Sequence, residues 1–404
     1  MDYFITKYDI AQPTGAECAV LEDTIMHKGR PVTAGSKILE GFISPIDATV
    51  VTRLEAAGVA VLGKTGMDEF GVSGLFAGSD AEGAADISAA AAAADGSASH
   101  SSGMRVSHSA VAAVAEGVAS FALCNDFSGA IRRQAAERGL CYIHPTYGTV
   151  SRYGLIPAVQ SMDQIGVICR NAGEGYRVLS IIAGHDPKDG AMFPGPEKDD
   201  AGKVSSSGAD LNSPLRIGVP VNVLSAFQDT SFADTVREIA GRFETVEFEL
   251  EYFNVYAQVM QILCCAEVSS NLSRYDGIKF GYRADGYANL NELYTKSRTQ
   301  AFGPDVKLAA ITGAMALSHE YYDKYYDKAM RIRRLIKESL DFDRYDAVIM
   351  PADTADSALA MNALPQLCGL PSVTFPYEGA GVTLIAGVRQ ENAIRRVQSE
   401  IGAF

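Results

Sequence analysis

The residues best suited to chemistry lie in a turn at 126–132, which reads Asp-Phe-Ser-Gly-Ala-Ile-Arg. The apolar run 121–124 directly before the turn has the length of a short buried strand. A helix with two arginines near its start follows the turn, so the backbone N–H groups of the turn can converge on one point. The sequence therefore predicts an anion-binding turn between a strand and a helix.

Strands and helices that would position this turn alternate along the chain. Small apolar residues at 104–116 predict a slim helix that stops at Gly117. Asp47 is expected to cap a second amphipathic helix, which ends at Gly58, and the apolar run 59–63 is a buried-strand candidate. Strands that alternate with helices at this spacing favour an α/β fold.

Composition narrows the class of protein. The chain has 404 residues, 47% of them hydrophobic, with a formal net charge of −14, and the sequence pI is about 4.9. Such a surface repels phosphate backbones, which argues against direct binding of nucleic acid. The seven cysteines form no C-x-x-C pair, and most lie in apolar runs, as expected in a reducing cytoplasm. No apolar run has the length of a membrane span, so we expect a cytoplasmic protein without a membrane partner.

The domain organisation is expected to be simple. We predict one domain over 1–404, without an internal repeat or a clear linker. Residues 74–103 are a low-complexity Ala/Gly/Ser stretch, and 186–214 are a polar surface connection.

Motifs distributed over most of the chain resemble the amidase signature family. Within that family the chain is most similar to the A subunits of glutamyl-tRNA(Gln) and aspartyl-tRNA(Asn) amidotransferases. The matching segments are 47–70, the turn itself, Pro-Thr-Tyr-Gly at 145–148, Val-Ser-Arg-Tyr-Gly-Leu at 150–155, Met-Asp-Gln-Ile-Gly at 162–166 and 267–277. The resemblance implies an α/β fold with a central mixed β-sheet covered by helices on both faces, here truncated at the N-terminus.

The same resemblance implies a catalytic triad whose three residue types are replaced in this chain. Family members use a serine nucleophile, a second serine that relays its proton and a lysine base. The motifs place Ala130 at the nucleophile, Val106 (24 residues earlier) at the relay serine and Glu22 at the lysine. The oxyanion turn would comprise Phe127, Ser128 and Gly129.

The resemblance also suggests substrate-binding residues. Arg333 lies where an arginine would hold the carboxylate of a substrate, and Asp126 and Arg132 are retained in the turn. Lys64 belongs to a separate turn motif, and we expect it to be solvated or to cap a nearby backbone group. Glu22 and Asp23 are adjacent acids without further ligands at suitable spacing, so neither a metal nor a cofactor is expected.

Two functional hypotheses follow. The first is a protein like the amidotransferase A subunits but without amidase or glutaminase activity, which binds a small amide or amino-acid ligand or a protein partner. The second is an active amidase or glutamine-dependent amidotransferase component with a rearranged site, in which Ser128 or Ser107 works with Lys64. The triple replacement favours the first hypothesis, and the retained scaffold supports the second.

Overall fold

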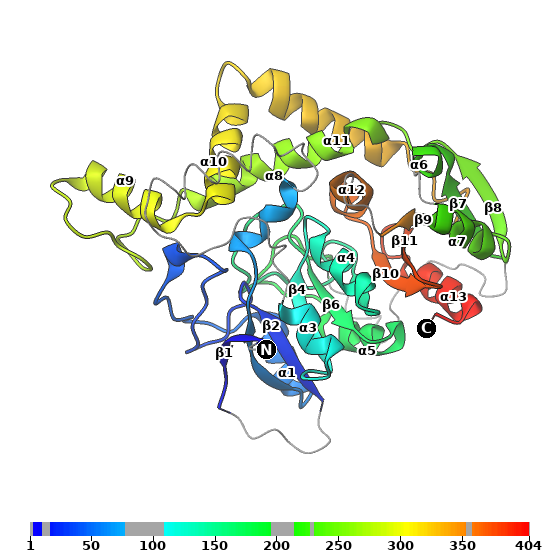
Figure 1. The fold of residues 1–404 in the computed structure, drawn as a ribbon, viewed down its shortest axis with the longest axis horizontal. Helices are drawn as coiled ribbons and strands as arrows, with labels where there is room; N and C mark the ends of the chain where they lie inside the picture. The colour runs from blue at the N-terminus through cyan, green and yellow to red at the C-terminus, as the bar shows by residue number, and fades with distance from the viewer. Residues whose placement is uncertain are drawn as a thin grey trace.

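The computed structural model describes residues 3–9, 17–76, 109–194, 214–226, 230–352 and 358–403. Its centre is an 11-stranded sheet in the order β1-β3-β2-β4-β6-β5-β10-β11-β9-β7-β8 (Figure 1). Parallel pairs (β2 with β3 and β4, β7 with β8 and β9) are combined with antiparallel pairs, so the sheet is mixed. The α/β fold with a central mixed sheet is therefore confirmed.

The strands come from both ends of the chain and join the same sheet. Their bounds are β1 Phe4–Lys7, β2 Cys18–Glu22, β3 Ala60–Thr65, β4 Phe121–Asn125, β5 Cys141–His144, β6 Ile165–Cys169, β7 Arg216–Pro220, β8 Glu244–Phe248, β9 Ala347–Pro351, β10 Ser372–Tyr377 and β11 Ala380–Ala386. The N-terminal strands lie at one end of the sheet, and β7 and β8 lie at the other (Figure 1).

The helices vary widely in length. Their bounds are α1 Thr49–Ala56, α3 Ser109–Ala115, α4 Ala130–Glu137, α5 Ala172–Ile182, α6 Val221–Ala226, α7 Thr230–Ala240, α8 Tyr256–Leu272, α9 Leu290–Ala301, α10 Pro304–Leu317, α11 Lys328–Glu338, α12 Ala358–Cys368 and α13 Glu391–Ile401. Short 3-10 helices are η1 Lys37–Leu39, η2 Glu69–Gly71, η3 Ser73–Leu75 and η4 Phe253–Val255, and η5 Tyr322–Asp327 is a π-helix. None of the described helices is both long and apolar enough to cross a bilayer.

Helices cover both faces of the sheet. Alternate residues of β2 point to opposite sides, as the pleat of a strand requires. Ala19 and Leu21 pack in a cluster with α1 and α5, whereas Val20 packs with α3 and α4 in another. A third apolar cluster joins α8, α10 and α12 to the sheet, through Val348 of β9 among other residues. The core therefore lies on both sides of the strands that carry the candidate site.

Most local predictions around the turn are confirmed. Strand β4 and helix α3 lie where the apolar patterns predict them, and Gly58 and Gly117 end their helices with positive φ angles of 78° and 77°. The predicted cap of α1 is wrong. Ala48 is the N-cap, without a side-chain cap, and the carboxylate of Asp47 accepts the backbone N–H of Lys28 at 2.7 Å. A distant backbone donor therefore takes the acceptor that local spacing had assigned to the helix.

The predicted Ala/Gly/Ser stretch starts in folded structure, because η3 covers its first residues and Leu75 is buried. The remainder of that stretch, 77–103, lies outside the described residues. The polar connection predicted for 186–214 is described over 186–194 and at 214. Its first residue, Asp186, is buried and accepts the hydroxyl of Ser151 at 2.7 Å.

Candidate functional site

Glu22 and the turn lie together because β2 and β4 are parallel neighbours. Parallel strands end at the same edge of a sheet, so the last residue of β2 meets the last residue of β4. The Oε2 atom of Glu22 accepts the backbone N–H of Asn125 at 2.6 Å and the hydroxyl of Thr24 at 3.1 Å. Two positions that the motifs assign to one active site are thus joined at one edge of the sheet.

The carboxyl group of Glu22 is buried, with only 1% of the residue exposed. Burial raises the pKa of Glu22 from 4.5 to about 8, and the nearby charges of Asp68 and Asp126 raise it further, while the two hydrogen bonds oppose the shift. Its second oxygen, Oε1, has no hydrogen-bond partner among the described residues. Glu22 consequently favours its neutral form near pH 7.

Lys64 lies on β3, where it pairs with Leu21 of β2. Contrary to the expected solvated side chain, Lys64 is fully buried, and its ammonium donates to the backbone carbonyl of Ile25. Burial lowers the pKa of Lys64 to about 8, although the charges of Asp23 and Glu22 oppose the shift. The prediction failed because the interior position of β3, between β1 and β2, is not visible in the local motif.

Asp126 and Arg132 form a buried ion pair at the start of α4, with 2.9 Å between Arg132 Nε and Asp126 Oδ2. The same carboxylate accepts the backbone N–H groups of Ile131 and Arg132, both at 3.1 Å. Arg132 Nη2 also donates to the backbone carbonyl of Asp126 at 3.0 Å. Four hydrogen bonds therefore hold the turn against its helix, in addition to that of Gln366 to the carbonyl of Asp126.

Phe127 and Ser128 occupy the centre of the turn, and both are buried. The ring of Phe127 packs so close to Gly71 that a Cβ there would lie 3.3 Å from a ring carbon. Ser128 lies against Gly74, where a Cβ would come within 2.4 Å of its hydroxyl oxygen. The hydroxyl of Ser128 is thus pressed against the backbone of η3.

Gly129 allows the chain to enter α4. It is the N-cap, with φ of 84° and ψ of 1°, a left-handed conformation that glycine adopts without strain. A Cβ at this position would lie 2.3 Å from the Cβ of Asn362 on α12. Ala130 follows as the first residue of α4 and is only partly buried. At the position assigned to the nucleophile the chain therefore presents a methyl group. Val106, assigned to the relay, lies outside the described residues.

A polar network connects β4 to the segment before β6. The side-chain amide of Asn125 donates to Asp163 at 2.9 Å and accepts the backbone N–H of Gln164 at 3.0 Å. Asp163 also accepts the backbone N–H groups of Ala158 and Val159. Burial raises the pKa of Asp163 to about 6, and these hydrogen bonds oppose the shift. Sequence reasoning noted the motif at 162–166 but did not connect it to Asn125.

Arg333 is half-buried on α11, and three of its nitrogen atoms already have partners. Nε donates to the carbonyl of Leu367 at 2.7 Å, Nη1 to the hydroxyl of Ser161 at 2.9 Å and Nη2 to the carbonyl of Ser161 at 3.2 Å. These bonds tie α11 to the end of α12 and to the segment that carries Asp163.

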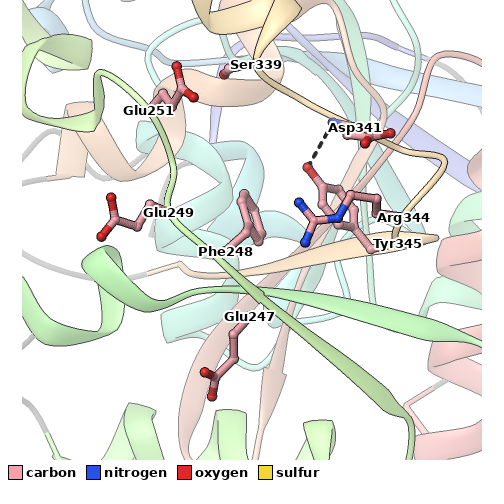
Figure 2. Close-up of a pocket in the computed structure, with 8 residues that line it drawn as sticks. All are labelled: Glu247, Phe248, Glu249, Glu251, Ser339, Asp341, Arg344 and Tyr345. Atoms are coloured by element: carbon pink, nitrogen blue, oxygen red, sulfur yellow. Dashed lines mark hydrogen bonds between the residues drawn. The ribbon is translucent and has the colours of Figure 1, made fainter.

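Two hollows in the described part of the chain differ in their relation to the site. One of about 170 Å³ includes Asp163 in its lining, together with Arg152, Lys188 and Asp189. The other, of about 300 Å³, lies beside β8 and shares no residue with the turn (Figure 2). Its lining is Glu247, Phe248, Glu249, Glu251, Ser339, Asp341, Arg344 and Tyr345. Of the two, the smaller hollow is the one connected to Glu22, through Asp163 and Asn125.

Comparisons with known proteins agree with the resemblance. A model of the amidase family matches residues 19–375. The A subunit of glutamyl-tRNA(Gln) amidotransferase from Lachnoclostridium phytofermentans is 38% identical in an alignment covering 88% of this chain and 74% of that relative. The protein of the same name from Acinetobacter baumannii (strain ATCC 17978) is also 38% identical, with 82% of this chain and 66% of that relative covered.

Solved structures agree on the fold. The protein of the same name from Thermotoga maritima superposes with a TM-score of 0.70 at 23% identity, and the match covers 99% of this chain and 86% of that one. The peptide amidase of Stenotrophomonas maltophilia superposes with a TM-score of 0.67 at 24% identity, with coverage of 95% and 82%. The expected mixed α/β architecture is thus shared with solved amidases.

Proposed function

Because this chain belongs to the amidase family and is similar to amidotransferase A subunits, we propose that it retains their scaffold but not their amide-hydrolysing chemistry. In this proposal the protein is a pseudoenzyme that works by binding. Its ligand is a small amide or an amino acid, or its partner is a protein. The retained turn and the buried network around it are the parts that would hold such a ligand.

The pairing of Glu22 with Ala130 at neighbouring strand ends carries the proposal. Acyl transfer needs a nucleophile that can lose a proton and a base that can accept it. The methyl group of Ala130 has no proton to lose. Glu22 is held by Asn125 and Thr24, and its neutral form is favoured by burial, so it is poorly suited to act as a base. Two of the three family functions are therefore missing within the described residues.

A rearranged active site is the competing function, and Lys64 is the observation that favours it. Its pKa, lowered to about 8, leaves a fraction of the amine neutral near pH 7.5, as a catalytic lysine base requires. The candidate nucleophile in the described structure is Ser128, whose hydroxyl faces the backbone of η3. The ammonium of Lys64 donates instead to the carbonyl of Ile25. Ser107, the other candidate, lies outside the described residues.

Asp126, Arg132 and Arg333 are proposed to act in ligand binding by different means. Asp126 and Arg132 are fully engaged with the turn, so they would set its shape instead of contacting the ligand. Arg333 would bind a ligand carboxylate only by exchanging one of its bonds to Ser161. A ligand carboxylate at Arg333 should therefore loosen the contact between α11 and the 158–163 segment.

A protein partner is the second part of the proposal. The similar amidotransferase proteins are each named as one lettered component of an enzyme. We propose that this chain does not replace such a component, because without a nucleophile it would supply no ammonia. Mixing the purified chain with the other components of an amidotransferase should give no stoichiometric complex in size-exclusion chromatography. Stable co-elution would contradict this part of the proposal.

A serine-reactive probe tests the proposed loss of the nucleophile. The purified protein is incubated with a fluorophosphonate, and its intact mass is measured before and after. We expect no added mass, because no serine is activated. Labelling that disappears in both Ser128→Ala and Lys64→Met variants would instead establish the rearranged site. Labelling lost only in Ser107→Ala would locate the nucleophile there.

A further inference from the structure

Helix α10 is apolar on two opposite sides. On one side Val306, Ala309, Gly313 and Ala316 are buried. Gly313 lets α10 approach α8 closely, since a Cβ there would lie 1.9 Å from the carbonyl oxygen of Cys265. In Figure 1, α10 lies in the helical group beyond α8, away from the N-terminal strands.

The opposite side of α10 exposes a second apolar row. Leu308 is 36% exposed, Ile311 is 68% exposed and Met315 is 44% exposed, and Pro304 is exposed at the start of the helix. These four residues are spaced by four, three and four, which is the spacing of the seam between two coiled helices. No charged residue occurs between Lys307 and His319. A helix that is apolar on both sides is normally covered on both.

The seam residues complement a second copy of themselves. When two α10 helices pack antiparallel, Leu308 of each meets Ile311 of the other, and Pro304 of each meets Met315 of the other. Small side chains at Ala310 and Ala314 border this row and allow close approach. The antiparallel arrangement also places opposite ends of the helix dipoles side by side, whereas a parallel pair would align like ends. The symmetry is that of a closed two-fold dimer.

Charge favours this occupant over a membrane or a polyelectrolyte. Lys307 is the only cation on α10, too little for attraction to anionic lipid. The chain as a whole carries −14, so two copies repel each other except where the contact is free of charge. The seam provides such a contact.

We propose that this protein forms a two-fold homodimer through the exposed seam of α10, defined by Pro304, Leu308, Ile311 and Met315. The inference is independent of the proposed function. A seam of four residues per copy is shorter than a standard interface of about 1,600 Å² in total. The dimer should therefore form in a concentration-dependent manner. Added salt should strengthen it, because salt screens the repulsion between two acidic copies.

Sedimentation velocity of the full chain over a series of concentrations, at low and high salt, tests the proposal. We expect a monomer–dimer equilibrium whose dissociation constant falls as salt is raised. Ile311→Glu places one acid in each half of the seam and should raise that constant by about tenfold or more, because like charges would be desolvated together. Val388→Glu, at a site 43% exposed outside the helix group, is the matched control and should leave it unchanged.

Crosslinking identifies the contact itself. A mixture of Leu308→Cys and Ile311→Cys proteins, oxidised together, should give more crosslinked dimer than either protein alone. A protein that sediments as a monomer at every concentration would overturn the proposal, and would leave the seam to a different protein. So would a dimer that Ile311→Glu does not weaken.

Discussion

The carboxylate of Glu22 accepts the backbone N–H of Asn125 at 2.6 Å, and this bond ties the end of β2 to the end of β4. The family resemblance assigns a lysine to the position of Glu22. An acid that accepts from the backbone at the first residue before the turn fixes the strand ends, whereas a lysine would donate. The replacement has therefore changed both the charge and the hydrogen-bonding direction at the centre of the site.

Stability should fall as pH rises from about 4.5 to about 8. Below this window the carboxyl of Glu22 is protonated in both states. As the pH rises, the unfolded chain loses this proton first, because the folded-state pKa is raised to about 8. This group lowers the free energy of unfolding by up to about 1.4 kcal/mol per pH unit. Asp163 and Glu69, with pKa values raised to about 6 and 7, act in the same direction.

Glu22→Gln tests the share of this residue. Glutamine keeps an acceptor for Asn125 but cannot ionise, so the variant should gain stability relative to the unchanged protein at pH 8 and not at pH 4.5. Urea unfolding at both pH values measures the difference. Glu249→Gln, an exposed acid, is the control and should change neither value appreciably. Equal effects of the two substitutions would mean that Glu22 is ionised at little cost in the folded protein.

Breaking the Asp126–Arg132 pair should destabilise the fold strongly. Asp126→Asn alone leaves a buried guanidinium without its counter-charge and should cost about 3–5 kcal/mol. Adding Arg132→Met removes the unpaired charge, so the double variant should be more stable than the sum of the two single effects. A double-mutant cycle by urea unfolding measures this coupling. The exposed pair Arg334–Glu338 is the control, with expected coupling below about 1 kcal/mol.

Gly129→Ala should cost more than Gly139→Ala, although both glycines have a positive φ, 84° and 75°. Alanine in the left-handed conformation costs about 1–2 kcal/mol at either position. At 129 the added Cβ also meets Asn362 at 2.3 Å, whereas nothing lies within 4 Å at 139. We expect an additional cost of about 1–3 kcal/mol for Gly129→Ala, measured by urea unfolding. Equal costs would show that α12 moves away readily.

Local pattern was sufficient for the elements that flank the turn. The apolar run of β4 and the stop at Gly117 are properties of neighbouring residues, and motif spacing brought Glu22 and Ala130 to one site. Contacts that depend on sheet order were not predictable. The burial of Lys64 follows from the place of β3 between two strands, and the bond of Asn125 to Asp163 joins residues 38 apart. Asp47 likewise chose a distant donor over its own helix.

Restoring the family residues should recover activity only in stages. Ala130→Ser alone should give none, because its hydroxyl has no base, and members of such a unit act together. Adding Glu22→Lys and Val106→Ser should still leave background rates, since Phe127 and Ser128 distort the oxyanion turn, where one lost donor costs on the order of 10²–10³ in rate.

Only a five-site variant that also carries Phe127→Thr and Ser128→Gly should hydrolyse an amide measurably. Because Phe127 is buried, far-ultraviolet circular dichroism must show that this variant folds. Robust turnover by the three-site variant would mean that the turn already holds an oxyanion.

Ammonia release from glutamine and asparagine tests the central claim most directly. The purified full chain is incubated with each amide at pH 7.5, and ammonia is compared with a heat-killed sample and with a Glu22→Gln, Lys64→Met, Ser128→Ala variant. We expect the same ammonia in all three samples, because the position of the nucleophile holds Ala130. Ammonia from the unchanged protein above both controls would contradict the loss of amidase chemistry.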